Sequence, residues 1–395
     1  MKRVYIAAYR QSKFGKLLGM TVPGIVSAAV NGVCAEIGVD ASALDVGSIG
    51  AACNMTLNEQ GLLSGLMAMT PGLASKPIEA VENACASGGQ AILSVIAKLQ
   101  MGWGETGIAV GYEKMRDAEG KMDGKLVGKA LGYFSHPAER EGKVFVFPHI
   151  FAEVMRDYMA TYGVTEEDLA RIAVAEYAMA NHNPYAQMRK VHVTLEQAMA
   201  IEGINRYVVD GLPMKTYDCS QITDGYAALI VATEDGLRKL GVAKPDCVEI
   251  AGYAQVTDPL ATSGRDVLKA KGAHCAMARA YTMAGLTPAD VNVAEIHDCF
   301  SVMGAIGTEV IGKAALGEGA RYWKDGKGGI NTSGGLIAKG HPIGATGVAM
   351  VGWASWQLLG KAPVELQVPD ARAAATFNIG GPICASVCTV LKCAA

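Results

Sequence analysis

The sequence has 395 residues, of which 50% are hydrophobic, 18% are charged and 6% are aromatic. This composition is typical of a globular protein large enough for two or three domains, and it argues against disorder and coiled coil. The formal net charge is -3 and the basic residues form no block, so we expect no nucleic-acid partner and no membrane-surface partner.

The chain begins with an alternating strand pattern and not with a charged segment followed by an apolar one. No eighteen uncharged apolar residues run together anywhere in the sequence. We therefore expect no signal peptide, no membrane span and a cytoplasmic location. The ten cysteines are too sparse for a disulfide scaffold, which fits a reducing compartment.

Residues 3–46 and 247–293 show the same succession of elements. Each begins with a strand, continues through a polar loop into a helix that stops at Gly38 or Gly285, and ends with a capped turn that enters a buried strand. We therefore predict a duplicated α/β protein with largely parallel sheets. Ligands are expected to bind between its two similar halves.

The first chemical motif, at residues 81–90, lies between a predicted strand and a helix with one apolar stripe. It places Cys85 at the helix N-terminus, where free amides and the helix dipole favour a thiolate over a thiol. Small neighbouring residues leave room for a substrate close to the backbone. By position alone, Cys85 is equally well interpreted as a nucleophile or as a small buried thiol.

Residues 116–214 differ from the two copies, since a polar start rich in lysine and glycine precedes helical stretches such as residues 166–181. We interpret this region as an inserted loop domain. The first half then comprises residues 1–115 and a return segment at 215–245, and the second half comprises residues 246–395.

His297 and Cys299 follow a strand predicted at residues 291–296, and open α/β sheets place functional groups at such strand ends. In an extended chain the two side chains point to the same face, which would pair a base with a thiol. From this segment alone, an ordinary buried histidine fits equally well.

Five glycines occur in residues 331–347, together with one histidine and one proline. Such glycine density indicates backbone that lines a ligand, and we expect Ser333, Gly334 and Gly340 to contact the substrate. His341 is fixed in a turn between a glycine and a proline. A phosphate-binding loop is the rival interpretation, but the dinucleotide and Walker spacings are both lacking.

A Gly-Gly turn that begins at Gly380 leads into the last apolar strand, and its amides could complete an oxyanion site. Cys384 and Cys388 lie four residues apart in this strand region. No second pair and no nearby histidine completes a zinc site, so core packing is the better interpretation and we expect no bound metal.

These motifs resemble those of the thiolase family, and they appear in the family's order along nearly the whole chain: the Cys85 segment, the Gly-His-Pro motif at residues 340–342 and the C-terminal Gly-Gly motif. Residues 180–187 and 219–230 are similar to further family segments. The motif His-Asp-Cys-Phe at residues 297–300 is similar to that of sterol-carrier-protein-2 type thiolases and archaeal acetoacetyl-CoA thiolases.

The resemblance implies the thiolase fold, in which two βαβαβαββ halves form a layered α-β-α-β-α core with an inserted loop domain. It also implies thiolytic cleavage of a 3-oxoacyl-CoA, or the reverse Claisen condensation, through an acyl group on Cys85. Coenzyme A would be a co-substrate, and no cofactor would be permanently bound.

The resemblance further assigns roles to the site residues. His341 would activate Cys85 as its base, and His297 and His341 would donate hydrogen bonds to an enolate oxygen. The backbone amides of Cys85 and Gly380 would hold the tetrahedral oxyanion. Other thiolases have a catalytic cysteine where this chain has Asn378, so the resemblance implies Cys299 as the second acid/base, with Cys384 as the less favoured substitute.

The family also implies partners. We expect CoA thioester substrates and a homodimer or dimer of dimers, and we consider a small zinc-containing OB-fold protein as an additional partner. The acyl pocket is expected to include Phe145, Phe147 and Met155. Two alternatives stay open, a non-catalytic or partner-dependent thiolase-like subunit of an acyl-transfer complex and another Cys-His-His condensing enzyme.

Overall fold

The computed structural model describes residues 1–325 and 328–394. The first half contributes the strands β1 (Val4–Gln11), β2 (Val46–Gly50), β3 (Ile78–Val81), β4 (Thr106–Glu113) and β5 (Gly225–Thr233). The second half contributes β6 (Val248–Thr257), β7 (Val293–Ile296), β8 (Ala373–Gly380) and β9 (Ala385–Cys393). All of these strands belong to one sheet in the order β3-β2-β4-β5-β1-β6-β9-β8-β7.

From the centre of the sheet outward, β1, β5, β4 and β2 of the first half correspond to β6, β9, β8 and β7 of the second. This repetition is the arrangement that the duplicated sequence predicts. The position that β3 holds in the first half is reduced in the second to a single parallel bridge between Ala294 and Ile330. The halves join where β1 pairs with β6 over two residues, Tyr5 opposite Glu249 and Ile6 opposite Val248. A ligand site between the halves therefore has a continuous framework behind it.

The expectation of largely parallel sheets is wrong. Strand β2 pairs in parallel with β3 and β4, and β7 pairs in parallel with β8, but the ladders β1–β5, β1–β6, β4–β5, β6–β9 and β8–β9 are antiparallel. The reason is that each half ends with a returning strand, β5 or β9, that lies between its parallel strands and its first strand.

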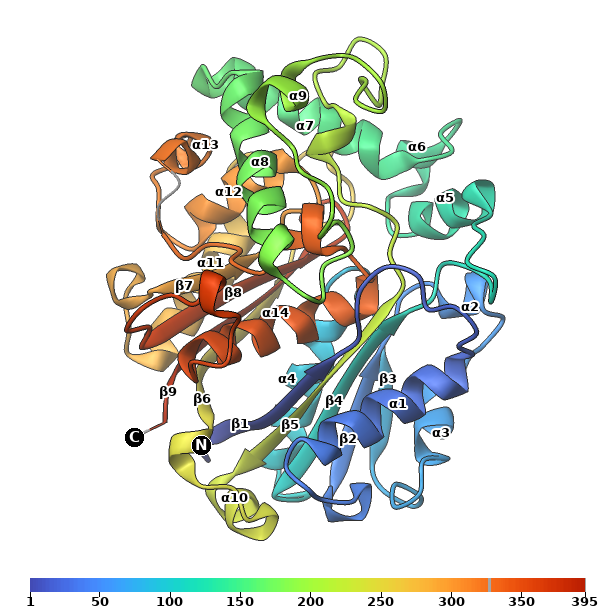
Figure 1. Ribbon diagram of the computed structural model, residues 1–395, viewed down its shortest axis with the longest axis vertical. Helices are drawn as coiled ribbons and strands as arrows, with labels where there is room; N and C mark the ends of the chain where they lie inside the picture. The colour runs from blue at the N-terminus through green and yellow to red at the C-terminus, as the bar shows by residue number, and fades with distance from the viewer. Residues whose placement is uncertain (326–327, 395) are drawn as a thin grey trace.

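Helices cover both faces of the sheet and also fill the space between its halves. They are α1 (Val22–Ala35), α2 (Asn54–Leu57), α3 (Leu63–Ala68), α4 (Ser87–Gln100), α10 (Glu234–Leu240), α11 (Lys271–Ala284), α12 (Ser301–Val310), α13 (Gly319–Tyr322) and α14 (Ile343–Leu358). Helices α4 and α14 pack against each other, and α14 also contacts strands of both halves (Figure 1). Helices α1 and α3 cover the first half and α11 and α12 the second, which gives the predicted layers.

The predicted apolar stripe of α4 explains its central position. Ile92, Val95, Ile96 and Leu99 are all buried, in one cluster with Val348 of α14. Because these residues recur at helical spacing, one face of α4 is apolar along its whole length. The first turn of α4, and with it Cys85, is thereby fixed against the start of α14.

Between β4 and β5 the described chain forms helices and no strand. These helices are α5 (Gly124–Gly132), α6 (Pro137–Arg140), α7 (Val146–Tyr162), α8 (Glu166–His182) and α9 (Leu195–Met199). A capping box between Thr165 and Asp168 starts α8, the helix that the sequence predicts there. The region lies over one end of the sheet in Figure 1. Across the described ranges, no helix is both long and apolar enough to span a membrane.

Candidate active site

Cys85 lies in a tight turn between β3 and α4, as the sequence predicts. Ala84 has a φ of 47°, and this left-handed residue turns the chain sharply just before the cysteine. The Ser87 hydroxyl accepts from the Asn83 amide at 2.9 Å and donates to the Ala84 carbonyl at 2.6 Å, which closes the turn. The half-buried Cys85 side chain therefore enters a cavity from a fixed position.

His341 lies two residues before the start of α14, in the position that Cys85 holds relative to α4. Its backbone amide donates to the Thr223 hydroxyl at 3.0 Å, and its ring Nδ1 lies 2.7 Å from the Thr346 hydroxyl. Gly340 has a φ of 115°, and a Cβ there would lie 3.0 Å from Thr223. The turn is therefore closely packed, and the His341 ring has one nitrogen free to face the cavity.

His297 follows β7 and is fully buried, and the structure brings it to the other two residues. Its ring centroid lies 4.9 Å from that of His341, with the rings at 89°. One side-chain atom each of Cys85, His297 and His341 lies within 4.8 Å of the others. Three segments far apart in the sequence thus form one nucleophile-and-imidazole site. The same spacing would suit a soft metal ion, so the absence of a metal stays a prediction.

Burial controls the protonation of this site. It raises the pKa of Cys85 to about 12, with further increases from the charges of Glu113 and Glu82, while the Gly381 backbone amide lowers it. Burial lowers the pKa of His341 to about 3 and, together with His341, the pKa of His297 well below its usual range. The expectation of a resting thiolate is therefore wrong, because the loss of solvent outweighs the helix N-terminus. The resting groups are a thiol and two neutral imidazoles.

Asn378 of β8 connects two of these residues. Its amide nitrogen donates to the Cys85 carbonyl at 3.0 Å and lies 3.1 Å from Nδ1 of His297. The sequence singles out this position only as one where a cysteine is missing. No one-dimensional signal identifies the contact, because residues 85, 297 and 378 lie on three separate segments.

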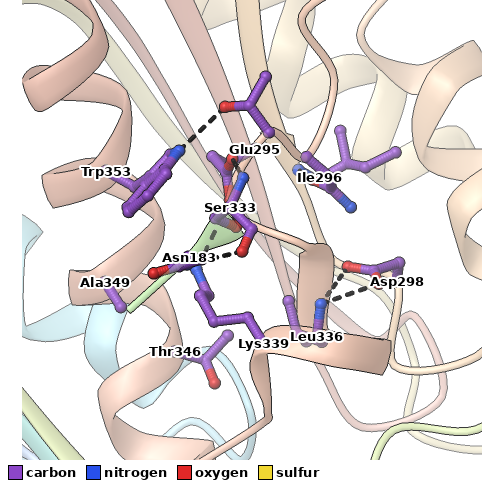
Figure 2. Close-up of polar contacts among 12 residues, drawn as sticks. Asn183, Glu295, Ile296, Asp298, Ser333, Leu336, Lys339, Thr346, Ala349 and Trp353 are labelled. Carbon is purple, nitrogen blue, oxygen red and sulfur yellow. Dashed lines mark hydrogen bonds and ion pairs between the residues drawn. The ribbon is translucent and has the colours of Figure 1, made fainter. Parts of the chain in front are cut away.

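A buried polar network joins Glu295 and Asp298, which flank His297 in the sequence, to residues 333–339 of the loop that leads to His341 (Figure 2). Asp298 accepts hydrogen bonds from the backbone amides of Leu336 and Ile337, and Glu295 accepts from the amide and hydroxyl of Ser333. Nζ of the buried Lys339 lies 3.6 Å from a carboxylate oxygen of Glu295. The acidic residues on both sides of His297 thus fix its distance from His341.

Helix α8 adds Glu176 to this network. Burial, followed by the neighbouring Asp298, raises the pKa of Glu176 well above its usual range. It also accepts from the Asn331 side-chain amide at 2.8 Å. The helical region between β4 and β5 is therefore coupled to both histidine-bearing segments.

The residues expected to contact substrate in the glycine-rich loop lie against other parts of the chain. Ser333 is bonded to Glu295, a Cβ on Gly334 would meet Ala180 of α8, and Gly340 lies against Thr223. Within the described residues, none of the three lines the cavity. Packing accounts for the glycine density, and the role of these residues in substrate binding stays a prediction.

The two candidate acid/base thiols are placed differently. Cys299 lines the cavity beside His297, whereas Sγ of Cys384 donates to the Asp258 carbonyl and is not part of the described lining. Burial raises the pKa of Cys299 well above its usual range, so it holds a proton at neutral pH. The predicted oxyanion donor Gly380 ends β8, whereas the amides that lower the pKa of Cys85 are those of Gly381 and of Cys85 itself.

The cavity above these residues has a volume of about 130 Å³ and an apolar wall. Five of the seven phenylalanines of the chain lie in this wall, and they include the predicted Phe145 and Phe147. The other three are Phe134, Phe151 and Phe300. The expectation for Met155 is wrong, because this fully buried side chain belongs to the hydrophobic cluster that the helical region shares with the second half, and it is not part of the described cavity lining.

A cationic groove lies beside this cavity on α5 and α6. Lys125, Lys129, Arg140 and Lys143 line it without an acidic residue, and its volume is about 330 Å³. The Arg140 guanidinium lies 5.3 Å from the centroid of the Tyr133 ring. The groove and the apolar cavity share a wall, since Val144 and Val146 line the groove and the intervening Phe145 lines the cavity.

The chain is similar to known proteins in both sequence and fold. Residues 4–235 match the family described as "Thiolase, N-terminal domain", and residues 254–393 match "Thiolase C-terminal domain-like". An acetyl-CoA acetyltransferase of Methanothermobacter thermautotrophicus is 35% identical over 96% of this chain and 97% of that protein. Sterol carrier protein 2 of Bos taurus is 32% identical over 96% of this chain and 70% of that protein. The solved Ltp2-ChsH2(DUF35) aldolase shares the fold, with a TM-score of 0.80 at 22% identity over 99% of this chain and 98% of that chain.

Proposed function

This chain belongs to the thiolase family and is an acyltransferase, and on that premise we propose that it exchanges acyl groups between coenzyme A thioesters through an acyl-Cys85 intermediate. One observation carries the proposal. The sulfur of Cys85 and ring nitrogens of His297 and His341 lie within 4.8 Å of one another, and all three residues line one apolar cavity. A thiol suits this exchange because it is both a good nucleophile and a good leaving group from a thioester.

The cleavage step begins with attack of Cys85 on the 3-oxo carbonyl carbon of the substrate. His341 takes the thiol proton as the carbon-sulfur bond forms, because Cys85 is not ionised at rest. The carbon-carbon bond then breaks, and its electron pair moves to the departing acetyl-CoA as an enolate. An N–H of His297 stabilises the enolate oxygen, a contact of the kind worth about 10² to 10³ in rate.

The second stage restores the enzyme. The Cys299 thiol protonates the α-carbon of the enolate and releases acetyl-CoA, which leaves Cys299 as a thiolate. Free coenzyme A gives its thiol proton to Cys299 and attacks the acyl-Cys85 carbonyl, and the Cys85 sulfur leaves with the proton that His341 holds. Both cysteines end as thiols, so the cycle balances, and its reverse is a Claisen condensation.

The cavity indicates the size and polarity of the acyl group. An apolar protein cavity of about 150 Å³ is known to hold a benzene ring, so a space of similar size fits an aryl group. The phenylalanine-rich wall offers ring edges and faces to such a group. We therefore assign 3-oxoacyl-CoA substrates with an aryl or comparably compact apolar acyl group, in preference to acetoacetyl-CoA.

The cationic groove fits the other end of the substrate. Coenzyme A carries phosphates, and Lys125, Lys129, Arg140 and Lys143 supply positive charge in the groove that adjoins the acyl cavity at residues 144–146. We assign the phosphate contacts to this groove. Arg140→Glu should then raise KM for coenzyme A and leave the acylation of Cys85 by saturating thioester unchanged; an unchanged KM would place the phosphates elsewhere.

Peptide mass spectrometry tests the intermediate. The protein is incubated with acetoacetyl-CoA, with a straight-chain 3-oxoacyl-CoA and with 3-oxo-3-phenylpropanoyl-CoA, and coenzyme A is added afterwards. We expect an adduct on Cys85 that coenzyme A removes, most abundant with the phenyl substrate. Cys85→Ala should give no adduct, and Cys275→Ala, at an exposed cysteine, should behave as the parent protein.

The result would also decide between the alternatives. No adduct from any thioester would contradict the proposal and favour a non-catalytic subunit. An adduct that forms only after a second protein is added would establish a partner-dependent subunit. Light scattering on the same samples would measure the predicted homodimer or dimer of dimers.

A further inference from the structure

The orientation of the Asn378 side chain is fixed by one of its partners. The Cys85 backbone carbonyl can only accept a hydrogen bond, so the group 3.0 Å from it must be the amide NH₂ and not the amide oxygen. The same NH₂ has a second proton, and Nδ1 of His297 lies 3.1 Å away. That ring nitrogen therefore accepts, and the proton of the neutral His297 ring is on Nε2.

The hydrogen bonds of His341 lead to the opposite arrangement. The Thr346 hydroxyl has one proton, and the Pro342 carbonyl 3.2 Å away can only accept it. That carbonyl also accepts the backbone amides of Ala345 and Thr346. When the hydroxyl gives its proton to the carbonyl, its oxygen accepts from Nδ1 of His341 at 2.7 Å, and this is the arrangement that we infer. His341 thus carries its proton on Nδ1, and its Nε2 presents a lone pair.

Two neutral imidazoles in contact are thereby given different chemistry by their neighbours. Nε2 of His297 is buried and has no hydrogen-bond partner within the described residues, so its proton is available to a ligand oxygen. Both rings line the cavity with Cys85. The low pKa of each histidine keeps the two rings uncharged, so the tautomer decides which is donor and which is base.

We propose that Asn378 is a positioning residue that sets His297 as the Nε2–H hydrogen-bond donor, while Thr346 sets His341 as the Nε2 base. The inference rests on the proposed acyl transfer for its catalytic consequence, but not for the tautomers themselves. Asn378 performs no proton transfer. A thiol in its place would have a single proton and could not satisfy the Cys85 carbonyl and His297 together.

Variants at position 378 separate the hydrogen bonds from the shape of the side chain. Asn378→Asp replaces the NH₂ with an acceptor, so His297 should move its proton to Nδ1. Asn378→Leu has a similar size and removes both hydrogen bonds, which should leave His297 as a mixture of tautomers. Asn31→Asp makes the same chemical change on the exposed face of α1 and serves as the control.

Nitrogen NMR of protein with ¹⁵N-labelled histidine reads the tautomers in the resting state. Signals of His297 and His341 are assigned from His297→Gln and His341→Gln. We expect a protonated Nε2 on His297 and a protonated Nδ1 on His341 in the parent protein, with His297 reversed in Asn378→Asp. For both Asn378 variants kcat should fall about 10²-fold with KM within about twofold, since the lost contact is made to the transition state.

Each outcome decides the inference. A protonated Nδ1 on His297 in the parent protein, or an Asn378→Leu variant with unchanged tautomers and kcat, would overturn it. If Asn378→Asp does not fold, Asn378→Leu with the same NMR reading still decides. Expected tautomers without any acylation of Cys85 would refute the proposed function alone, whereas acylation with the reversed tautomer would refute the role of Asn378 alone.

Discussion

The two halves of the protein have the same succession of strands and helices, but they differ in the side chains at the ends of corresponding elements. The last residue of β2 in the first half is Gly50, and a Cβ there would lie 2.4 Å from the Ser87 carbonyl oxygen. The corresponding residue after β7, 247 positions later, is His297. Before the central helix the first half has Cys85 and the second has His341.

This difference shows that the nucleophile and the histidines require different surroundings. The nucleophile needs close backbone approach, which glycine and alanine provide around Cys85. The two histidines need fixed orientation inside the protein, and the second half supplies it with buried charged residues. Glu295 occupies the position of Ser48 in the first half, a buried residue whose hydroxyl has no partner within the described chain.

Removing the base of the second half should have the largest effect. His341→Ala leaves Cys85 as a thiol without a proton acceptor, and acylation should slow by about 10⁴-fold, the upper range for general-base catalysis. Stopped-flow measurement of Cys85 acylation checks this, with His182→Ala at the exposed end of α8 as the control. Acylation within tenfold of the parent rate would show that His341 is not the base.

Breaking the buried ion pair beside His297 tests what its charges contribute to the second half. Lys339→Met leaves Glu295 without its counter-charge in a fully buried place, and such a change costs about 3 to 5 kcal/mol of unfolding free energy. Urea denaturation measures it. The double variant Glu295→Gln/Lys339→Met should recover most of the loss, because no unpaired charge remains. Equal stability of the single variant and the parent would show that the pair carries no charge.

A Cys299 variant tests whether proton transfer and acylation depend on different thiols. Cys299→Ala should slow solvent deuterium exchange into acetyl-CoA by about 10² to 10³-fold, since a proton donor in a transition state contributes about that much. Acylation of Cys85 should continue. Cys384→Ala is the matched control, because its thiol is directed to Asp258. Undiminished exchange in Cys299→Ala would assign the proton transfer elsewhere.

The sequence was sufficient to predict features that depend on residues close together in the chain. The duplicated elements predicted the order of strands and helices, and strand ends and glycine-rich turns located Cys85, His297 and His341. The pattern could not report that β5 and β9 return antiparallel, because pairing direction depends on partners far along the chain.

The rest of the site depends on burial and contact, which one-dimensional patterns do not contain. A helix N-terminus predicts an acidic thiol, but the enclosure of Cys85 raises its pKa instead. The loop glycines predict a ligand, but Gly334 and Gly340 meet Ala180 and Thr223. Asn378 shows the limit most clearly, because its two contacts exist only after three segments meet.

The smallest expected effect concerns Glu113, which is hydrogen-bonded to both halves of the protein. This buried carboxylate at the end of β4 accepts amides of Ala52 and Cys53 after β2 and of Gly344 in the first turn of α14. Burial raises its pKa to about 7 from an ordinary value of 4.5, and its charge raises the pKa of Cys85. Glu113→Gln should therefore lower the pH midpoint of Cys85 alkylation by iodoacetamide by about one pH unit.

The same carboxylate links stability to pH with a defined sign. Between about pH 4.5 and 7 the folded protein holds the Glu113 proton and the unfolded chain does not, so this group's contribution to the unfolding free energy falls as pH rises across that window. Subtracting the urea unfolding free energy of Glu113→Gln from that of the parent isolates the contribution of the Glu113 carboxyl group. The difference should be larger at pH 5 than at pH 8, and a difference that does not change with pH would show that Glu113 is ionised throughout and joins the two halves as a carboxylate at every pH.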